Sequence, residues 1–238
     1  YKRFYRKSKI KIFSIFFLIE AIKIKKFYLK NYNYFKKIFY ITNFDLKYDF
    51  RIMKLKTKNK FKLLNRNKLN TKKLDLYDSK SKNFLFIANF KSISNLVATW
   101  NNLVVEKELK KKNKKINTYF CGNTGLLFKL LLSLFNKKKF FLGNIEYLPK
   151  TKIRFKSGLA NLVYSSGFQN KVLEYFNLNL QTITSREVSY GFAKDDRKIL
   201  KIYKSTNEFK DLVHNVLKYK DVSKKSINSI KSNNVGNF

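Results

Sequence analysis

From residue 83 onward, the hydrophobic and polar positions change period several times. Residues 84–90 form a short apolar run rich in phenylalanine, which predicts a buried strand. Apolar residues then recur at three-to-four spacing from Ile93 to Val104, which predicts a helix with Trp100 on its core-facing side. Residues 116–121 predict a second strand. The turn Gly122–Thr124 leads into a very apolar segment that predicts a helix over residues 125–135.

The same alternation continues to residue 219, so the sequence predicts an α/β fold, an alternating strand–helix sandwich with helices on a central sheet. The further elements expected are strands over residues 140–147, 152–155, 159–164 and 178–184, and helices over residues 169–176 and 207–219.

Residues 1–82 have a different texture, with lysines and aromatic residues interleaved and no glycine or proline. An apolar run over residues 12–22 is interrupted by Glu20 and is shorter than the ~20 residues of a membrane span, so we expect a helix but no span. The texture divides the chain into four parts. They are a basic N-terminal extension (1–82), an α/β domain (83–206), an amphipathic C-terminal helix (207–220) and a flexible tail (221–238).

The charge is strongly unbalanced, with 53 Lys and Arg against 15 Asp and Glu and a formal net charge of +38. Such an excess favours a polyanionic partner, and nucleic acid is the first candidate. Lysine far exceeds arginine, 46 to 7, which favours phosphate contacts over base reading. The candidate RNA-binding residues are Lys25, Lys26, Lys36, Lys37, Lys91, Asn123, Thr124, Lys137, Lys138 and Lys139.

Residues that carry catalytic chemistry are sparse. His214 is the only histidine and falls on the polar side of a predicted helix. Cys121 ends a predicted strand with no histidine nearby in sequence, which favours a small buried residue over a nucleophile and excludes a disulfide framework. The pair Asp195 and Asp196 lacks a third ligand at metal-binding spacing. We therefore expect no enzyme activity, no metal and no cofactor.

The loop over residues 122–125 joins a strand to the start of a helix, as phosphate-binding loops do. It lacks the lysine and Ser/Thr of a P-loop, and its spacing does not fit a dinucleotide fingerprint. Two interpretations stay open. The loop is a simple turn, or its amides hold an RNA phosphate at the start of a helix.

Two segments resemble a known family. FLFIANFKSISNLVATWNNL and INTYFCGNTGLLFKLL, within residues 83–135, resemble the opening of ribosomal protein ten, the stalk-base protein of the large ribosomal subunit. SGLANLVYSSGFQNKVLEYF, residues 157–176, resembles a later strand and helix of that family, although Gly122 stands where the family usually has lysine. The resemblance implies binding to ribosomal RNA at the stalk base.

The resemblance also implies partners. In that family a C-terminal helix carries the acidic stalk proteins, and the predicted helix over residues 207–219 takes that place or, alternatively, packs in the core. Its candidate partner-binding residues are Phe209, Leu212, Val213, Val216 and Leu217.

The lysine-, asparagine- and phenylalanine-rich composition is typical of A/T-rich organelle genomes. With the resemblance, it leads us to expect a structural protein of the mitochondrial ribosome in the mitochondrial matrix, bound to ribosomal RNA and other mitochondrial ribosomal proteins. The alternatives are a small-subunit ribosomal protein, an organellar RNA-processing enzyme and a subunit of a membrane complex.

Overall fold

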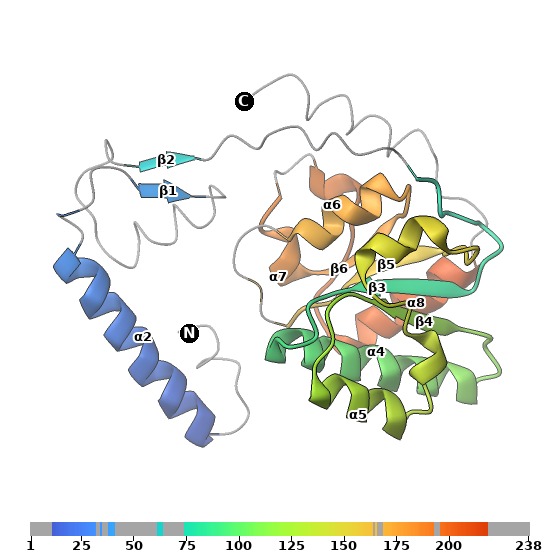
Figure 1. Ribbon diagram of the computed structural model, residues 1–238, viewed down its shortest axis with the longest axis horizontal. Coiled ribbons are helices and arrows are strands. Elements are labelled where there is room, and N and C mark those ends of the chain that lie inside the picture. The colour runs from blue at the N-terminus through green and yellow to red at the C-terminus, as the bar shows by residue number, and fades with distance from the viewer. Residues whose placement is uncertain are drawn as a thin grey trace. The chain divides into compact units, whose positions relative to one another are not determined.

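The chain forms two compact units, residues 1–66 and 67–238, in a computed structural model (Figure 1). The described residues are 11–31, 34, 38–40, 61–63, 74–163, 165, 169–192 and 196–218. Unit 1 contains helix α2 (Lys11–Asn31) and a pair of short parallel strands, β1 (Ile38–Tyr40) and β2 (Phe61–Leu63). None of the helices in the described part of the chain is long and apolar enough to cross a membrane, as expected. The predicted domain boundary between residues 82 and 83 stays a prediction.

Unit 2 is built on a five-stranded sheet in which every pair of neighbouring strands is parallel. The strand order is β4-β3-β5-β6-β7, and the predicted α/β class is thereby confirmed. The strands are β3 (Asn83–Ile87), β4 (Asn117–Cys121), β5 (Ser157–Ala160), β6 (Thr182–Ser185) and β7 (Lys201–Tyr203).

Helices cover both faces of this sheet. Helix α4 packs beside α5 and α8, and Figure 1 shows α6 and α7 on the other side of the sheet from α4 and α5. The helices are α4 (Ile93–Lys111), α5 (Leu126–Leu134), α6 (Asn170–Asn177), α7 (Arg186–Ser189) and α8 (Thr206–Lys218), with 3-10 turns η2 (Lys138–Phe140), η3 (Ile145–Lys150) and η4 (Asp196–Ile199).

The strands predicted over residues 140–147 and 152–155 are wrong. Half of the first segment lies in η2 and η3, and each segment pairs through a single bridge, at Phe141 and Phe155 respectively. Gly143 has a φ of 84°, which turns the chain out of an extended course. Pro149 has no N–H to donate to a sheet, so the apolar residues here pack as turns.

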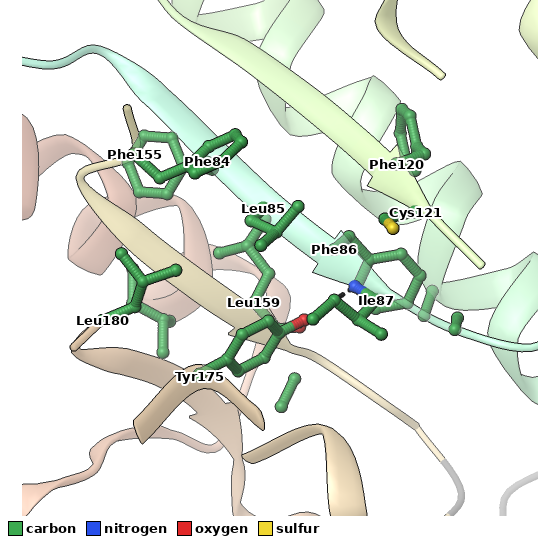
Figure 2. Close-up of a cluster of buried hydrophobic side chains, with 14 of the residues drawn as sticks. Phe84, Leu85, Phe86, Ile87, Phe120, Cys121, Phe155, Leu159, Tyr175 and Leu180 are labelled. Carbon is green, nitrogen blue, oxygen red and sulfur yellow. Dashed lines mark hydrogen bonds between the residues drawn. The ribbon is translucent and has the colours of Figure 1, made fainter. Parts of the chain in front are cut away.

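The centre of the core is Tyr175 of α6, which reaches between β3 and β5 where the two strands separate. Its ring lies over Gly158, where an added Cβ would be 2.3 Å from Tyr175 Cγ. Its hydroxyl accepts a hydrogen bond from Ile87 N at 2.8 Å and donates one to Leu159 O at 2.7 Å. Figure 2 shows the ring beneath the two strands with its oxygen directed at the Ile87 nitrogen. The hydroxyl thus replaces a ladder hydrogen bond that the diverging strands no longer make.

We expect Tyr175→Phe to lower the free energy of unfolding by about 1–3 kcal/mol, because it leaves the buried Ile87 N–H without its partner. Urea unfolding followed by circular dichroism measures this loss. Tyr203→Phe is a matched control at a half-buried tyrosine of β7, whose pKa is raised by burial. An unchanged free energy of unfolding in Tyr175→Phe would mean that the hydroxyl bridge contributes nothing to stability.

Helix α8 belongs to the core of unit 2. Phe209, Val213 and Val216 are buried, and Leu212 and Leu217 are partly buried against the same core. The stripe proposed for a protein partner is therefore covered by the chain's own sheet and by α4. Of the two interpretations that the sequence left open, the structure has the core-packing helix.

Trp100 is not a core residue, contrary to the sequence prediction. It is 47% exposed, and its ring meets Phe135 edge-on with centroids 5.4 Å apart. The α4 residues that face the core are instead Ala98, Leu103 and their neighbours. The apolar spacing of α4 is wide enough for two faces, and the sequence pattern did not indicate which one the sheet would cover.

Candidate functional site

The strand order places a topological switch point between β3 and β5, the position at which open α/β sheets have a ligand crevice. The connection that follows β3 leads to β4, which lies on one side of β3. The connection that follows β5 leads to β6, which lies on the opposite side, so the two connections diverge between β3 and β5. In open α/β sheets, ligands bind at the carboxyl ends of the strands that flank such a switch point. The described segments at this edge are residues 88–92 after β3 and residues 161–163 after β5.

Side chains from the two diverging crossovers meet at this edge. Lys171, in the first turn of α6, donates a hydrogen bond from Nζ to Oδ1 of Asn95 at 2.9 Å. Asn95, in the first turn of α4, also donates from Nδ2 to the backbone oxygen of Asn89 at 2.8 Å. Asn161, directly after β5, donates to Ala98 O at 3.2 Å. These bonds fasten α4, α6 and both strand ends together around the crevice.

Lys171 is a buried cation without an acidic partner among the described residues. Its ammonium lies 4.7 Å from the centre of the Phe86 ring and is bonded to a neutral amide oxygen. Burial lowers the pKa of Lys171 to about 7. A buried lysine normally has a carboxylate beside it, so this one has an electrostatic environment that an incoming anion would improve.

The start of α6 adds backbone donors next to Lys171. Gln169 stands at its N-cap without a side-chain hydrogen bond to the helix. Helices α4 and α5 begin at the same edge of the sheet, and their N-caps, Ser92 and Gly125, also lack such a bond. Uncapped first turns carry free amides and the positive end of the helix dipole, which both favour an anion.

A half-buried carboxylate lies one turn further along α6. Glu174 follows Lys171 by three residues, so both side chains lie on neighbouring positions of the helix surface. Burial raises the pKa of Glu174. Its carboxylate has acceptor capacity for hydroxyl groups, whereas the Lys171 ammonium has donors for phosphate oxygens.

The loop after β4 forms the neighbouring wall of this edge. Gly122 has a φ of 133°, and an added Cβ would lie 2.0 Å from the backbone oxygen of Ala88. Phe90 N donates to Asn123 O at 2.8 Å, and Gly122 N donates to Gly143 O at 2.8 Å. Backbone hydrogen bonds thus join the loop after β4 to its neighbours, and the loops after β3 and β4 can approach this closely because residue 122 has no side chain.

The candidate RNA-binding residues do not form one site. Lys25 and Lys26 are exposed on α2, and Lys36 and Lys37 lie outside the described residues. In unit 2, Lys91 and Asn123 are exposed and Thr124 is half-buried, at the carboxyl edge of the sheet. Lys138 and Lys139 are exposed in η2, which follows the far end of α5.

Lys137 is a structural residue rather than a phosphate contact. It is buried, its ammonium pairs with Oε1 of Glu106, and it lies 3.7 Å from the centre of the Phe140 ring. Lys110 pairs with the same oxygen at 2.7 Å, while Oε2 of Glu106 accepts from Thr118 N at 2.9 Å. Burial lowers the pKa of Lys137, and Glu106 opposes this effect. Lys137 therefore satisfies the buried Glu106 beside β4.

Cys121 is a small buried residue, as the sequence favoured. Cys121 is buried at the end of β4, and burial raises the pKa of its thiol to about 12. His214 is half-buried on α8, and Asp195 lies outside the described residues. Within the described ranges, His, Cys, Asp and Glu side chains do not gather into a group of three that could hold a metal ion.

Comparison with solved structures identifies the same fold in sugar-transferring enzymes. TarM is similar to this chain with a TM-score of 0.62 and 14% identity over 90% of this chain and 42% of TarM. An S. aureus TarM variant was solved with fondaparinux, alpha-GlcNAc-glycerol and UDP, and it gives a TM-score of 0.59.

Two further enzymes share the fold. The glycosyltransferase WaaG, involved in lipopolysaccharide biosynthesis, gives a TM-score of 0.53 and 11% identity over 83% of this chain and 56% of WaaG. The pneumococcal O-GlcNAc transferase GtfA, solved with UDP and GlcNAc, gives 0.53 and 14% over 87% of this chain and 43% of GtfA. The chain thus spans about half the length of the structures it matches. No protein-family model and no curated protein matches the sequence.

These findings overturn the ribosomal assignment. The similar structures named above include a glycosyltransferase and an O-GlcNAc transferase and no ribosomal protein, so the resemblance to ribosomal protein ten is wrong. The partners inferred with it, ribosomal RNA, mitochondrial ribosomal proteins and acidic stalk proteins, and the expectation of a protein without enzyme activity are corrected with it. The expected ribosomal fold and the observed fold both alternate strands and helices. They differ in strand order, which local sequence patterns do not indicate.

Sequence reasoning missed Lys171, Glu174 and Asn95. A signal was present in the segment over residues 165–174, where serine and glycine precede a predicted helix with a lysine near its start. However, the residues next to Lys171 in sequence do not distinguish it, as a lysine that becomes buried, from the other 45 lysines of the chain. Its importance follows from the crossover that brings it to Asn95 of another helix.

Proposed function

We propose that unit 2 binds a sugar nucleotide at the crevice between β3 and β5, and that the chain is the nucleotide-binding part of a sugar-transferring enzyme. The observation that carries this proposal is Lys171, a buried cation at the switch point that donates to one neutral acceptor and forms no ion pair within the described part of the chain. A diphosphate in the crevice would supply the missing negative charge. The uncapped start of α6 supplies amides for the same phosphates.

In this proposal, Lys171 and Glu174 bind different parts of the ligand. The ammonium of Lys171 stabilises the diphosphate and, during transfer, the negative charge that develops on the departing nucleotide. The carboxylate of Glu174 accepts hydrogen bonds from hydroxyls of the ribose or of the sugar. Asn95 holds the lysine toward the crevice and is a positioning residue.

The likeness to TarM and GtfA supports the choice of ligand class, because both were solved with UDP and an N-acetylglucosamine group. The sugar leaves the nucleotide and joins an acceptor hydroxyl, which gives up its proton as the glycosidic bond forms. Because the chain spans about half of the similar structures, we assign it the donor nucleotide and leave acceptor binding to residues outside unit 2.

Titration of the 238-residue chain with UDP-GlcNAc tests this proposal. The diphosphate of UDP-GlcNAc is esterified at both ends and does not change charge near pH 7, so a pH dependence reports on the protein. Lys171 is charged below its pKa of about 7 and neutral above it. We therefore expect the affinity to be constant at acidic pH and to fall above pH 7, by up to about tenfold per pH unit. Isothermal titration calorimetry at pH 6, 7, 8 and 9 measures it.

A matched variant separates this effect from the general positive charge. Lys91 lies exposed at the same edge of the sheet, and Lys91→Met should weaken binding slightly and keep the pH dependence. Binding that is absent at every pH, or that does not vary between pH 6 and 9, would contradict the proposal.

We propose that the basic region over residues 1–82 is an extension that precedes the α/β domain, and its last residues contribute Leu76 to the core of unit 2. The mitochondrial location stays an untested prediction, and it has lost the support of the ribosomal assignment.

A further inference from the structure

Helices α4 and α5 expose an unusual number of large apolar side chains on the outside of unit 2. We name this surface the α4–α5 face. It consists of Ile93, Val97, Trp100, Leu126, Leu127, Leu130 and Leu134, which are 37–75% exposed. At 100° per residue, the α5 leucines fall within an arc of about 100° and the three α4 residues within about 60°. Each helix therefore carries one continuous apolar stripe.

The two stripes lie on adjacent helices that pack side by side on one face of the sheet (Figure 1). At one end, the Cβ position of Gly125 is 3.5 Å from Cγ of Lys91, which precedes α4. At the other end, Trp100 of α4 meets Phe135, the residue that ends α5. The two helices thus meet at both ends of α5, so the exposed residues of α5 and of the first half of α4 form one surface. Contiguous apolar surfaces of this kind mark contact sites.

The charge around this face has one sign. The sequence from residue 109 to residue 145, which contains α5, carries nine lysines and no acidic residue. Residues 79–105 also lack Asp and Glu. In the stripe of α4 itself, the positions after Trp100 are taken by exposed lysines, Lys107 and Lys111, and Lys129 is exposed on α5. The two acids of α4 are engaged elsewhere, Glu106 with Lys137 and Glu108 with Lys210.

From this combination we infer that the α4–α5 face binds the surface of an anionic lipid bilayer, with its leucines in the interface and its lysines at the phosphate headgroups. Amphipathic helices with leucine or tryptophan on one side and lysines beside them bind bilayers in this way. The inference is independent of the nucleotide site.

Charge and shape disfavour other occupants. A second copy of the chain would bring two acid-free, lysine-rich segments against each other. A nucleic acid would use the lysines, but aliphatic side chains do not stack on bases, and Trp100 is the one aromatic residue of the face. A bilayer accepts a row of leucines without a complementary pocket.

Co-sedimentation of the 238-residue chain with vesicles tests the inference. We expect binding to vesicles of phosphatidylglycerol and phosphatidylcholine in equal parts, and binding at least about tenfold weaker to phosphatidylcholine alone. The double variant Leu130→Gln/Leu134→Gln should lose at least about tenfold in affinity for the anionic vesicles. Both leucines are more than half exposed, so the variant should keep its circular dichroism and its affinity for UDP-GlcNAc.

Helix α2 provides the matched control, because it also exposes large apolar residues. Ile19→Gln/Phe27→Gln changes two of them, and we expect the variant to retain most of the vesicle binding. Wild-type chain that stays in the supernatant with anionic vesicles would overturn the inference. Vesicle binding by the α5 variant as tight as that of the wild type would also overturn it. So would a wild-type chain that is a dimer and does not bind vesicles, if the α5 variant is a monomer.

Discussion

Lys171→Met should make the protein more stable and abolish its binding of UDP-GlcNAc. The lysine titrates near pH 10.5 when the chain is unfolded and near 7 when it is folded. Between these values the unfolded chain binds more protons, so the free energy of unfolding rises with pH from about 7 to 10.5. Below pH 7 the full cost of burying the charged ammonium is present. Methionine has a similar volume and no charge, so it removes this cost.

We expect the gain in the free energy of unfolding to be on the order of 3–4 kcal/mol below pH 7 and to shrink as the pH approaches 10.5. Urea unfolding at pH 6 and pH 9 measures it, and calorimetry with UDP-GlcNAc measures the loss of binding. Lys91→Met, at an exposed position of the same edge, should change the free energy of unfolding by less than about 0.5 kcal/mol.

The two readouts together distinguish a functional lysine from a structural one. If Lys171 were only a packing residue, Lys171→Met would leave nucleotide affinity unchanged. If Lys171→Met instead lowered the free energy of unfolding at pH 6, its bond to Asn95 would outweigh the cost of burying the charge. A residue that costs stability and is retained for binding is typical of a functional site.

Gly122→Ala should lower the free energy of unfolding by roughly 3 kcal/mol or more. Two effects combine at this position. The φ of 133° is strained for any residue with a Cβ, and the added carbon would lie 2.0 Å from the backbone oxygen of Ala88. Because the opposing atom belongs to the backbone at the end of β3, no side-chain rotation relieves the contact.

Gly125→Ala is the matched control in the same loop. Its φ is −131°, and the nearest atoms to an added Cβ are 3.5 Å away, which is ordinary contact. We expect Gly125→Ala to cost at most about 1 kcal/mol, since alanine is a poorer N-cap than glycine. Urea unfolding followed by circular dichroism compares the two variants. Equal stabilities would mean that the loop after β4 does not approach β3 as closely as the structure shows.

Much of unit 2 follows from local sequence. The phenylalanine-rich run at residues 84–90 predicts a strand and includes all of β3 except Asn83. The periodic segments at residues 169–176 and 207–219 predict α6 and α8 to within one residue at each end. These elements are readable because burial of one helix face or of a whole strand requires a regular apolar pattern. Where glycine and proline interrupt that pattern, at Gly143 and Pro149, the predicted strands are wrong.

The candidate site is a product of strand order. Lys171 and Asn95 are 76 residues apart, and neither the spacing nor the composition of the segments between them indicates a contact. They meet because β5 pairs with β3 and not with β4, so that α4 and α6 begin on either side of one crevice. Pairing of parallel strands depends on long-range packing around Tyr175 and Gly158, which no local period encodes.

The exposed and buried faces of α4 and α5 show the same limit. Their sequences are apolar on more than one side, so composition indicates a helix but not which side the sheet covers. The sheet covers Ala98, Leu103 and Phe128 and leaves Trp100 and Leu130 outside. Net charge, by contrast, is additive over the chain, and the sequence alone establishes an excess of +38 and an affinity for anions. Which anion each lysine meets depends on burial, because a charge is strengthened or neutralised by its surroundings only after the chain has folded around it.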